Sequence, residues 1–226
     1  MDKITVPTKP EVEKYIFTAG IDYFTAGKDS IWGQGDKETL KILRKTEIKG
    51  DWLNLASGDG RYNKVLLEKA DSVLASDIDK SALSKLWHTT PEKYLAKLKI
   101  KKFDISKKFP VENESFDGIF CTGVLHLFPK EVLQNIVSEM DRVLKPKGKL
   151  IIDFSADISR TSQNGKAVTF GRGLLYNLEE ARGMLKALFR NYKVRMQDSK
   201  VVEDFEGANP PYTLTCNFVI LVAYKN

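Results

Sequence analysis

The sequence predicts an α/β fold: a doubly wound, mostly parallel seven-stranded sheet with an antiparallel C-terminal hairpin and an N-terminal helical lid. From residue 51 onward, strand-like runs alternate with helix-like segments, which is typical of a parallel sheet covered on both faces. A turn with two glycines, at residues 56–60, follows the first of these strands. No helical pattern fits between the last two strands, so they are predicted to form a hairpin at the sheet edge.

The first 47 residues differ from the rest of the chain, because aromatic side chains are frequent there and glycines interrupt them. They are predicted to form a short helix, a loop and a second helix over residues 36–45. We interpret residues 1–47 as a helical, aromatic cap on an α/β core of residues 48–226, the two making one domain. The aromatic side chains of this segment could close over a ligand as a lid, or pack together as a small core of their own; they are Tyr15, Tyr23, Phe24 and Trp32.

The remaining elements follow from hydrophobic periodicity. The clearest helix spans residues 131–144, where apolar side chains recur at three- and four-residue spacing before Lys147 and Gly148 stop it. Further helices are predicted over residues 62–70 and around residues 178–188. The predicted strands are residues 51–56, 72–77, 99–105, 118–122, 149–154, 193–197 and 213–224.

The composition excludes several classes of protein. The chain has 226 residues, 42% of them hydrophobic, which is enough for one sizeable core. Cys121 and Cys216 are far apart and form no metal-binding spacing, so we expect neither a disulfide nor a metal site. The N-terminus has no signal-peptide pattern, and the longest apolar run, residues 218–224, is too short to span a bilayer. We therefore expect a cytoplasmic protein with no membrane partner.

The formal net charge of +6 is modest, and lysines are densest over residues 97–102 and 107–108. Such clusters are typical of a solvated face, and they also leave open a contact with RNA or another polyanion. The charge alone does not choose between the two.

The most informative segment is residues 53–61, a strand that runs into a glycine turn and then into a helix. Gly58 and Gly60 have no Cβ, so a ligand can approach the backbone closely and unusual backbone dihedral angles are accessible. The free N–H groups at the start of the next helix add a positive electrostatic end. This arrangement predicts that a nucleoside-type cofactor binds at the turn.

Acidic residues at the ends of the next two strands fit the same cofactor. Asp77 follows the glycine turn by about twenty residues, the spacing at which a carboxylate accepts hydrogen bonds from ribose hydroxyls, whereas Asp79 is predicted to cap the next helix. Asp104 could accept a hydrogen bond from the exocyclic amine of a purine, with apolar neighbours against the ring. These strand ends share one edge of the sheet, where open α/β sheets bind their ligands.

A glycine turn with a ribose carboxylate fits both NAD and S-adenosylmethionine. The dinucleotide fingerprint requires a third small residue, but here Gly60 is followed by Arg61, Tyr62 and Asn63. The Tyr-x-x-x-Lys motif of short-chain dehydrogenases is also missing. S-adenosylmethionine is therefore favoured, and a dehydrogenase would require NAD binding.

Taken in order, several segments resemble the class I S-adenosylmethionine-dependent methyltransferases, and within them the small-domain group similar to the ubiquinone and menaquinone biosynthesis enzymes. The resemblance covers roughly residues 50–155, and the order and spacing of the motifs together make it specific. The matching segments are residues 53–61, 73–79, 103–105, 109–120, 121–128 and 142–150.

The resemblance implies a Rossmann-like methyltransferase fold, transferase activity, S-adenosyl-L-methionine as cofactor and S-adenosyl-L-homocysteine as product. It implies that Asp77 holds the ribose with Ile78 against the adenine, and that Asp104 meets the adenine amine with Ile105 against the ring. The Cys121 carbonyl would help to hold the methionine end. The other residues that the resemblance places around the methionine are Asn54, Ala56, Ser57, Gly58 and Gly60.

Two positions depart from the first motif of this family, which usually carries an acid and a glycine where this chain has Asn54 and Ala56. Asn54 can still orient the turn or the methionine amino group, but it lacks the charge that would pair with that group. Ala56 keeps the site small. We therefore expect a modest affinity for the cofactor.

Methyl transfer needs a base only when the acceptor must lose a proton. His126 is the candidate, because it follows the fourth strand near the expected position of the methyl group, although a histidine at this position often only shapes the site. Tyr23, Trp32, Phe205 and Tyr212 are predicted to bind the substrate, the last two from the loop of the C-terminal hairpin.

Residues 209–212, Asn-Pro-Pro-Tyr, match a tetrad of amino methyltransferases. Those enzymes carry it at the end of the fourth strand, whereas here it precedes the last strand, so a proline-stiffened loop is the simpler interpretation. The role of this loop stays open.

We predict an enzyme that transfers a methyl group from S-adenosylmethionine to an unidentified small molecule by in-line displacement. The lack of an appended RNA-binding module favours a small acceptor, while the lysine clusters keep methylation of tRNA or rRNA as an alternative. A second alternative is a catalytically silent, cofactor-binding scaffold for a partner enzyme, suggested by Asn54 and the lack of a clear base. The methylated atom and the oligomeric state stay open.

Overall fold

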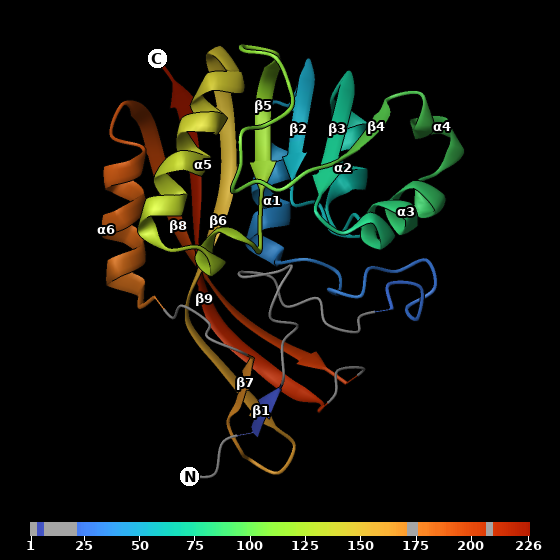
Figure 1. Cartoon of the computed structure of the whole chain (residues 1–226), viewed down its shortest axis with the longest axis vertical. Coiled ribbons are helices and arrows are strands. Elements are labelled where there is room, and N and C mark those ends of the chain that lie inside the picture. The colour runs from blue at the N-terminus through green and yellow to red at the C-terminus, as the bar shows by residue number, and fades with distance from the viewer. Residues whose placement is uncertain (1–3, 7–21, 171–175, 207–209) are drawn as a thin grey trace.

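The computed structural model describes residues 4–6, 22–170, 176–206 and 210–226 (Figure 1). Its main sheet contains β2 (Asp51–Leu55), β3 (Ser72–Asp77), β4 (Leu98–Lys102), β5 (Phe116–Cys121), β6 (Leu144–Ser162), β8 (Tyr192–Phe205) and β9 (Tyr212–Lys225). The spatial order is β4-β3-β2-β5-β6-β9-β8. The strands from β4 to β6 pair in parallel, and β9 pairs antiparallel with both β6 and β8. The predicted doubly wound sheet with an antiparallel C-terminal hairpin is confirmed.

Helices cover both faces of this sheet (Figure 1). Helices α1 (Lys37–Lys45), α2 (Asn63–Lys69) and α3 (Lys80–Thr89) pack on one face, and α5 (Lys130–Val143) and α6 (Leu178–Leu188) pack on the other. Successive residues of β2 show the division, because Trp52 belongs to the core of the first face and Leu53 to the core of the second. The short helices α4 (Glu92–Leu95) and η1 (Leu125–Leu127) follow α3 and β5.

Side-chain caps fix where the helices begin. Asp79 caps α3 as predicted, and its carboxylate accepts the N–H of Ser81 at 2.8 Å. Asp36 caps α1 by accepting the N–H of Thr39 at 2.7 Å. Since α3 begins immediately after β3, the turn between them places Asp77 and Asp79 at the carboxyl edge of the sheet.

Strands β6, β8 and β9 are longer than predicted and continue past the other strands at the carboxyl edge (Figure 1). The antiparallel pairing of these strands extends as far as Tyr212 of β9, which pairs with Ser162 of β6 and with Phe205 of β8. This pairing satisfies the hydrogen-bonding groups of the additional backbone. A second sheet at this end pairs β1 (Ile4–Val6) in parallel with β7 (Val168–Phe170). The helix predicted near the N-terminus, with Tyr15, lies outside the described residues.

The predicted end of the third strand is also wrong. Strand β4 ends at Lys102, three residues before the predicted end at residue 105, so Asp104 lies in the loop that follows. The Asp104 carboxylate accepts the N–H of Ser106 at 2.8 Å, which turns the chain away from the sheet.

Candidate functional site

A cavity of about 260 Å³ lies at the carboxyl edge of the sheet. One side is formed by the ends of β2, β3 and β5 and the loop after β4, and the other by β6, β8 and β9. Every predicted site residue contributes to its wall except Gly60 and Cys121. The predicted site residues in the wall are Tyr23, Trp32, Asn54, Ala56, Ser57, Gly58, Asp77, Ile78, Asp104, Ile105, His126, Phe205 and Tyr212.

Asp77 joins two turns at the floor of this cavity. One carboxylate oxygen accepts the N–H of Gly58 at 2.8 Å, and the other accepts the N–H of Asp79 at 2.9 Å. Burial raises the pKa of Asp77, and the two backbone hydrogen bonds oppose that effect. Because each carboxylate oxygen has a second lone pair, Asp77 can still accept hydrogen bonds from a ligand hydroxyl.

The glycine turn has the backbone that its sequence predicts. Gly58 has a φ of +54°, and a Cβ on it would lie 3.3 Å from the indole Nε1 of Trp32. Gly60 has a φ of +94°, and its Cβ would lie 3.0 Å from Leu86 on α3, so this glycine serves close packing outside the cavity wall. Ala56 also has a positive φ, of 50°, which is the left-handed region where a Cβ is unfavourable.

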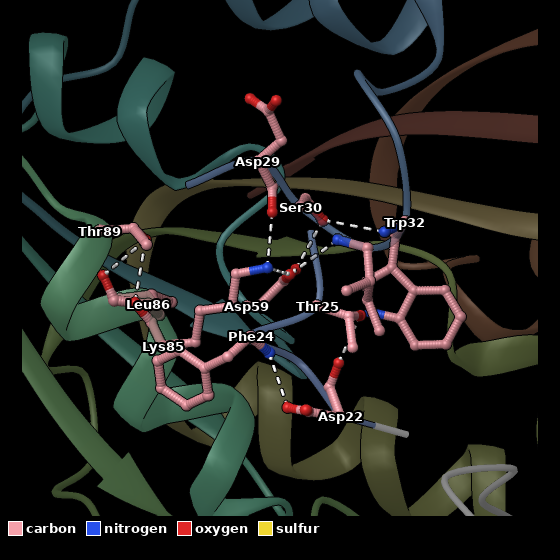
Figure 2. A network of polar contacts seen from close by, with 11 residues as sticks. Asp22, Phe24, Thr25, Asp29, Ser30, Trp32, Asp59, Lys85, Leu86 and Thr89 are labelled. Atoms are coloured by element: carbon pink, nitrogen blue, oxygen red, sulfur yellow. Dashed lines mark hydrogen bonds and ion pairs between the residues drawn. The ribbon is translucent and has the colours of Figure 1, made fainter. Parts of the chain in front are cut away.

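A buried polar network attaches the N-terminal segment to this turn (Figure 2). Between the two glycines, Asp59 forms an ion pair with Lys85 of α3 at 3.0 Å, and neither side chain is exposed. Asp59 also accepts the hydroxyl of Ser30 at 2.6 Å and the N–H of Ile31 at 2.9 Å, while Lys85 donates to the carbonyl of Asp29. Residues 29–31 are therefore held against the turn from two directions.

The same network places two aromatic side chains at the cavity. The Ser30 hydroxyl accepts the N–H of Trp32 at 3.1 Å, so the carboxylate of Asp59 positions Trp32 through Ser30 (Figure 2). The ring of Tyr23 meets the indole of Trp32 edge to face, with centroids 6.5 Å apart. Both aromatic residues lie in the cavity wall, and Tyr23 is buried.

Two residues expected around the methionine have other contacts. The amide of Asn54 donates to Oδ1 of Asn63 on α2 at 3.2 Å, which fixes a side chain that also faces the cavity. The side chain of Cys121 packs in the core under α5 and α6, where burial raises the pKa of its thiol. Thr122 and Gly123, which follow Cys121, form the cavity wall instead.

His126 lies in the cavity wall and is buried. Burial is the main cause that lowers the pKa of its imidazole to about 3, with a further contribution from Arg160. An imidazole with so low a pKa is a weak base. The ring of His126 packs edge to face on Phe154, with centroids 6.3 Å apart. These features favour the role of shaping the site over the role of base.

Three charged residues of the wall were not singled out by the sequence. Asp153, at the end of the apolar run of β6, is 1% exposed and accepts the N–H of Gly123 at 2.6 Å. Burial raises the pKa of Asp153 to about 7, and the nearby Arg61 opposes that effect. Arg61, directly after the glycine turn, forms an ion pair with Glu203 of β8 across the cavity.

The end of the C-terminal hairpin contributes an aromatic pair. Phe205 and Tyr212 are paired residues of β8 and β9, and their rings stack with centroids 5.1 Å apart and an angle of 25°. Both lie in the cavity wall. They belong to the strands themselves rather than to the loop between them, and Asn209 of the tetrad lies outside the described residues.

The residues of the wall fit a nucleoside cofactor with an amino-acid end. Asp77 and Asp104 offer carboxylates where ribose and adenine are expected, and Ile78 and Ile105 offer apolar surface. At the turn, the Ser57 hydroxyl is buried without a hydrogen-bond partner in the described part of the chain, so a polar group of a ligand would satisfy it. Among the described residues, no group of three His, Cys, Asp or Glu side chains could hold a metal ion.

Comparison with known proteins agrees with this geometry. Residues 53–152 match the family model described as "Methyltransferase domain". A comparison with curated protein sequences finds no match.

Solved structures share the fold. YcgJ from Bacillus subtilis is 12% identical, with 83% of this chain and 97% of that chain covered and a TM-score of 0.63. The DhpI–SAH complex is 21% identical, with 82% and 81% covered and a TM-score of 0.56. A SAM-dependent methyltransferase from Aquifex aeolicus is 19% identical, with 82% and 89% covered and a TM-score of 0.53.

The fold and the family match together indicate a methyltransferase domain over residues 53–152. The family model matches 100 of the 226 residues, and the solved structures share the fold of the chain. Membership of the ubiquinone and menaquinone group stays a prediction. No helix in the described part of the chain is long and apolar enough to cross a bilayer.

Proposed function

We propose that this enzyme methylates a small molecule and releases S-adenosylhomocysteine. The observation that carries the proposal is that one cavity joins two walls of different chemistry. The wall from β2, β3 and the loop after β4 offers the carboxylates of Asp77 and Asp104, while the hairpin offers the aromatic rings of Phe205 and Tyr212. A cofactor on the first wall and an acceptor on the second would share one cavity.

The proposed roles of the residues are mostly positional. S-adenosylmethionine supplies a methyl group that is already activated by its sulfonium, so the alignment of the acceptor provides most of the rate enhancement. Asp77 would hold the ribose hydroxyls, Asp104 the adenine amine, and Ser57 the methionine end. Trp32 and Tyr23, held by the network around Asp59, would exclude water from the cavity.

A small acceptor is supported by the cavity rather than by the surface. The lysines that suggested RNA include Lys99, Lys101 and Lys102, which are exposed on the edge strand β4. Exposed lysines on an edge strand also discourage pairing with other chains, so they have an adequate structural explanation. Methylation of tRNA or rRNA and a catalytically silent scaffold stay alternative predictions. The cytoplasmic location is also a prediction, and the oligomeric state stays open.

Calorimetric titration with S-adenosylmethionine tests the cofactor site. We expect binding to the wild type, a loss of about tenfold or more in Asp77→Asn, and no binding of NADH. Asp71→Asn is the matched control, because Asp71 is an exposed acid next to the opposite end of the same strand. Failure of the wild type to bind S-adenosylmethionine, or equal losses in both variants, would contradict the proposed site.

A further inference from the structure

In the half of the cavity formed by β6, β8 and β9, the charged side chains of the wall are acidic. We call this part of the cavity the acceptor half, and its side chains include Asp153, Ser155, Ile158, Leu214 and Phe218. These are apolar or uncharged apart from Asp153, and Glu203 of β8 is the other charged side chain of this half. One oxygen of the Asp153 carboxylate accepts the N–H of Gly123, and the other has no hydrogen-bond partner among the described residues.

The arginines around this half of the cavity already have partners. Arg61 is the basic residue of the wall, and its guanidinium is already paired with Glu203. Arg160 of β6, which lies outside the wall, forms a hydrogen bond with the wall residue Tyr212. His126 is neutral near pH 7 because burial lowers the pKa of its imidazole to about 3. An acceptor that carries a carboxylate or phosphate would therefore compete with Glu203 for Arg61 and would face Asp153.

A ligand with a positive charge would complete this half. A buried carboxylate without a partner is unfavourable, and a charge-assisted hydrogen bond from an ammonium group satisfies it better than a neutral hydroxyl does. The apolar and aromatic walls suit an organic body attached to that group, and aromatic faces attract a cation further. We propose that the acceptor is an amine with an apolar or aromatic body, and that Asp153 binds its ammonium group and takes a proton from it.

The proton transfer balances as follows. The ammonium R–NH3+ gives one proton to the Asp153 carboxylate, which leaves a neutral amine and a carboxylic acid. The nitrogen lone pair then forms a bond to the methyl carbon, while the carbon–sulfur bond breaks and its electron pair stays on sulfur. The products are the methylated ammonium R–NH2+–CH3 and S-adenosylhomocysteine, and Asp153 later releases its proton to water.

The ionisation of Asp153 supports this role. Its pKa is raised to about 7, mainly by burial and to a smaller extent by Asp36, although the hydrogen bond from Gly123 and the charge of Arg61 oppose the shift. A carboxyl with this pKa is ionised at slightly alkaline pH and is a much better proton acceptor than an exposed aspartate. Exchanging an ion pair for two neutral groups is also favoured in a buried site.

The inference rests on the proposed function, and three probes of one shape but different charge test it. Benzylamine, benzyl alcohol and benzoate are titrated into the full chain saturated with S-adenosylhomocysteine. At about pH 8.5 we expect benzylamine to bind the wild type about tenfold or more tightly than benzyl alcohol, and benzoate to bind least. At about pH 5.5 the preference for benzylamine should disappear, because Asp153 is then protonated while benzylamine keeps its charge.

Two variants separate Asp153 from general electrostatics. Asp153→Asn should remove the preference for benzylamine while S-adenosylhomocysteine still binds. Asp157→Asn removes an exposed carboxylate on the same strand and should leave the preference intact. If Asp153→Asn fails to fold, the comparison of the two pH values in the wild type decides alone.

Three results would overturn the inference: equal binding of benzylamine and benzyl alcohol, a preference that survives both Asp153→Asn and pH 5.5, or no binding of benzylamine at all. In each of these, binding of S-adenosylhomocysteine would leave the proposed cofactor site standing. Failure of S-adenosylhomocysteine to bind would instead remove the proposed function itself.

Discussion

The carboxylate of Asp59 lies 3.0 Å from the ammonium group of Lys85, and neither side chain is exposed to solvent. This pair connects the glycine turn of the cofactor wall to α3. Through Asp29, Ser30 and Ile31 it also holds the segment that carries Trp32. A buried pair with several additional hydrogen bonds is strongly destabilised when one partner is lost, because the other charge then stays buried without compensation.

We expect Lys85→Met to lower the free energy of unfolding by about 3–5 kcal/mol. Methionine fills a similar volume, so the loss would come from the unpaired Asp59 rather than from a cavity. Urea denaturation followed by circular dichroism measures the change.

Lys41→Met is the control for this variant. Lys41 pairs with Glu38 at 3.1 Å on α1, but its side chain is 55% exposed. An exposed pair contributes less than about 1 kcal/mol, so the control should change little. A loss in Lys85→Met no greater than that in Lys41→Met would show that the buried pair does not hold the turn.

The sequence predicts the fold well because the central strands show a clear local pattern of hydrophobic residues. Strand β3 has its predicted bounds, and the cores on the two faces follow from the alternation in β2. The outer part of β6 could not be predicted, because residues 155–162 are mostly small or polar. That part is a strand because it pairs with β9, a long-range contact that no local pattern reveals.

The site is predictable where a motif fixes it and not where tertiary contacts decide. The position of Asp77 in the site can be predicted from its spacing along the sequence from the glycine turn. Lys85 lies in an amphipathic helix, where a lysine suggests a solvated face, yet its side chain is fully buried. Asp153 stands at the end of an apolar strand, and its lone carboxylate in residues 149–154 was the signal that could have found it.

Ala56→Gly is expected to stabilise the protein. Ala56 has a φ of 50°, which costs a residue with a Cβ about 1–2 kcal/mol, while glycine adopts it freely. The greater flexibility of glycine in the unfolded chain costs about 0.5–1 kcal/mol, so the net gain should be up to about 1 kcal/mol. Thermal unfolding measures it. Ala75→Gly, in the buried and regular β3, should instead destabilise, and a loss in both variants would mean that Ala56 is not strained.

Asp153→Asn is expected to stabilise the protein at alkaline pH. The folded-state pKa of Asp153 is about 7, above its ordinary value of 3.8. Between these values the folded protein keeps a proton that the unfolded chain has released, so the free energy of unfolding falls as pH rises through this window. At about 1.4 kcal/mol for each pKa unit, the advantage of the variant should approach about 4 kcal/mol at pH 8 and vanish near pH 4. An advantage that does not depend on pH would contradict the raised pKa.

His126→Gln should show the opposite dependence. The folded-state pKa of His126 is about 3, below its ordinary value of 6.5. Between these values the unfolded chain binds a proton that the folded protein cannot, so the wild type loses stability as pH falls from about 6.5 toward 3. Glutamine does not titrate, and the variant should therefore gain on the wild type as pH falls. Urea unfolding at a series of pH values measures this, and parallel curves for the two proteins would show that the imidazole is not buried neutral.

Glu203→Gln should reverse the charge preference of the acceptor half. Glu203 pairs with Arg61 across the cavity, and its removal leaves the guanidinium without a partner beside the ligand. Benzoate should then bind the complex with S-adenosylhomocysteine about tenfold more tightly than it binds the wild type, because an arginine without a partner favours a carboxylate. Asp204→Asn is the matched control, since Asp204 is the next residue on β8, is exposed and bonds Thr213 instead. Equal benzoate affinity in the wild type and Glu203→Gln, or the same gain in Asp204→Asn, would show that the ion pair does not set the charge of the site.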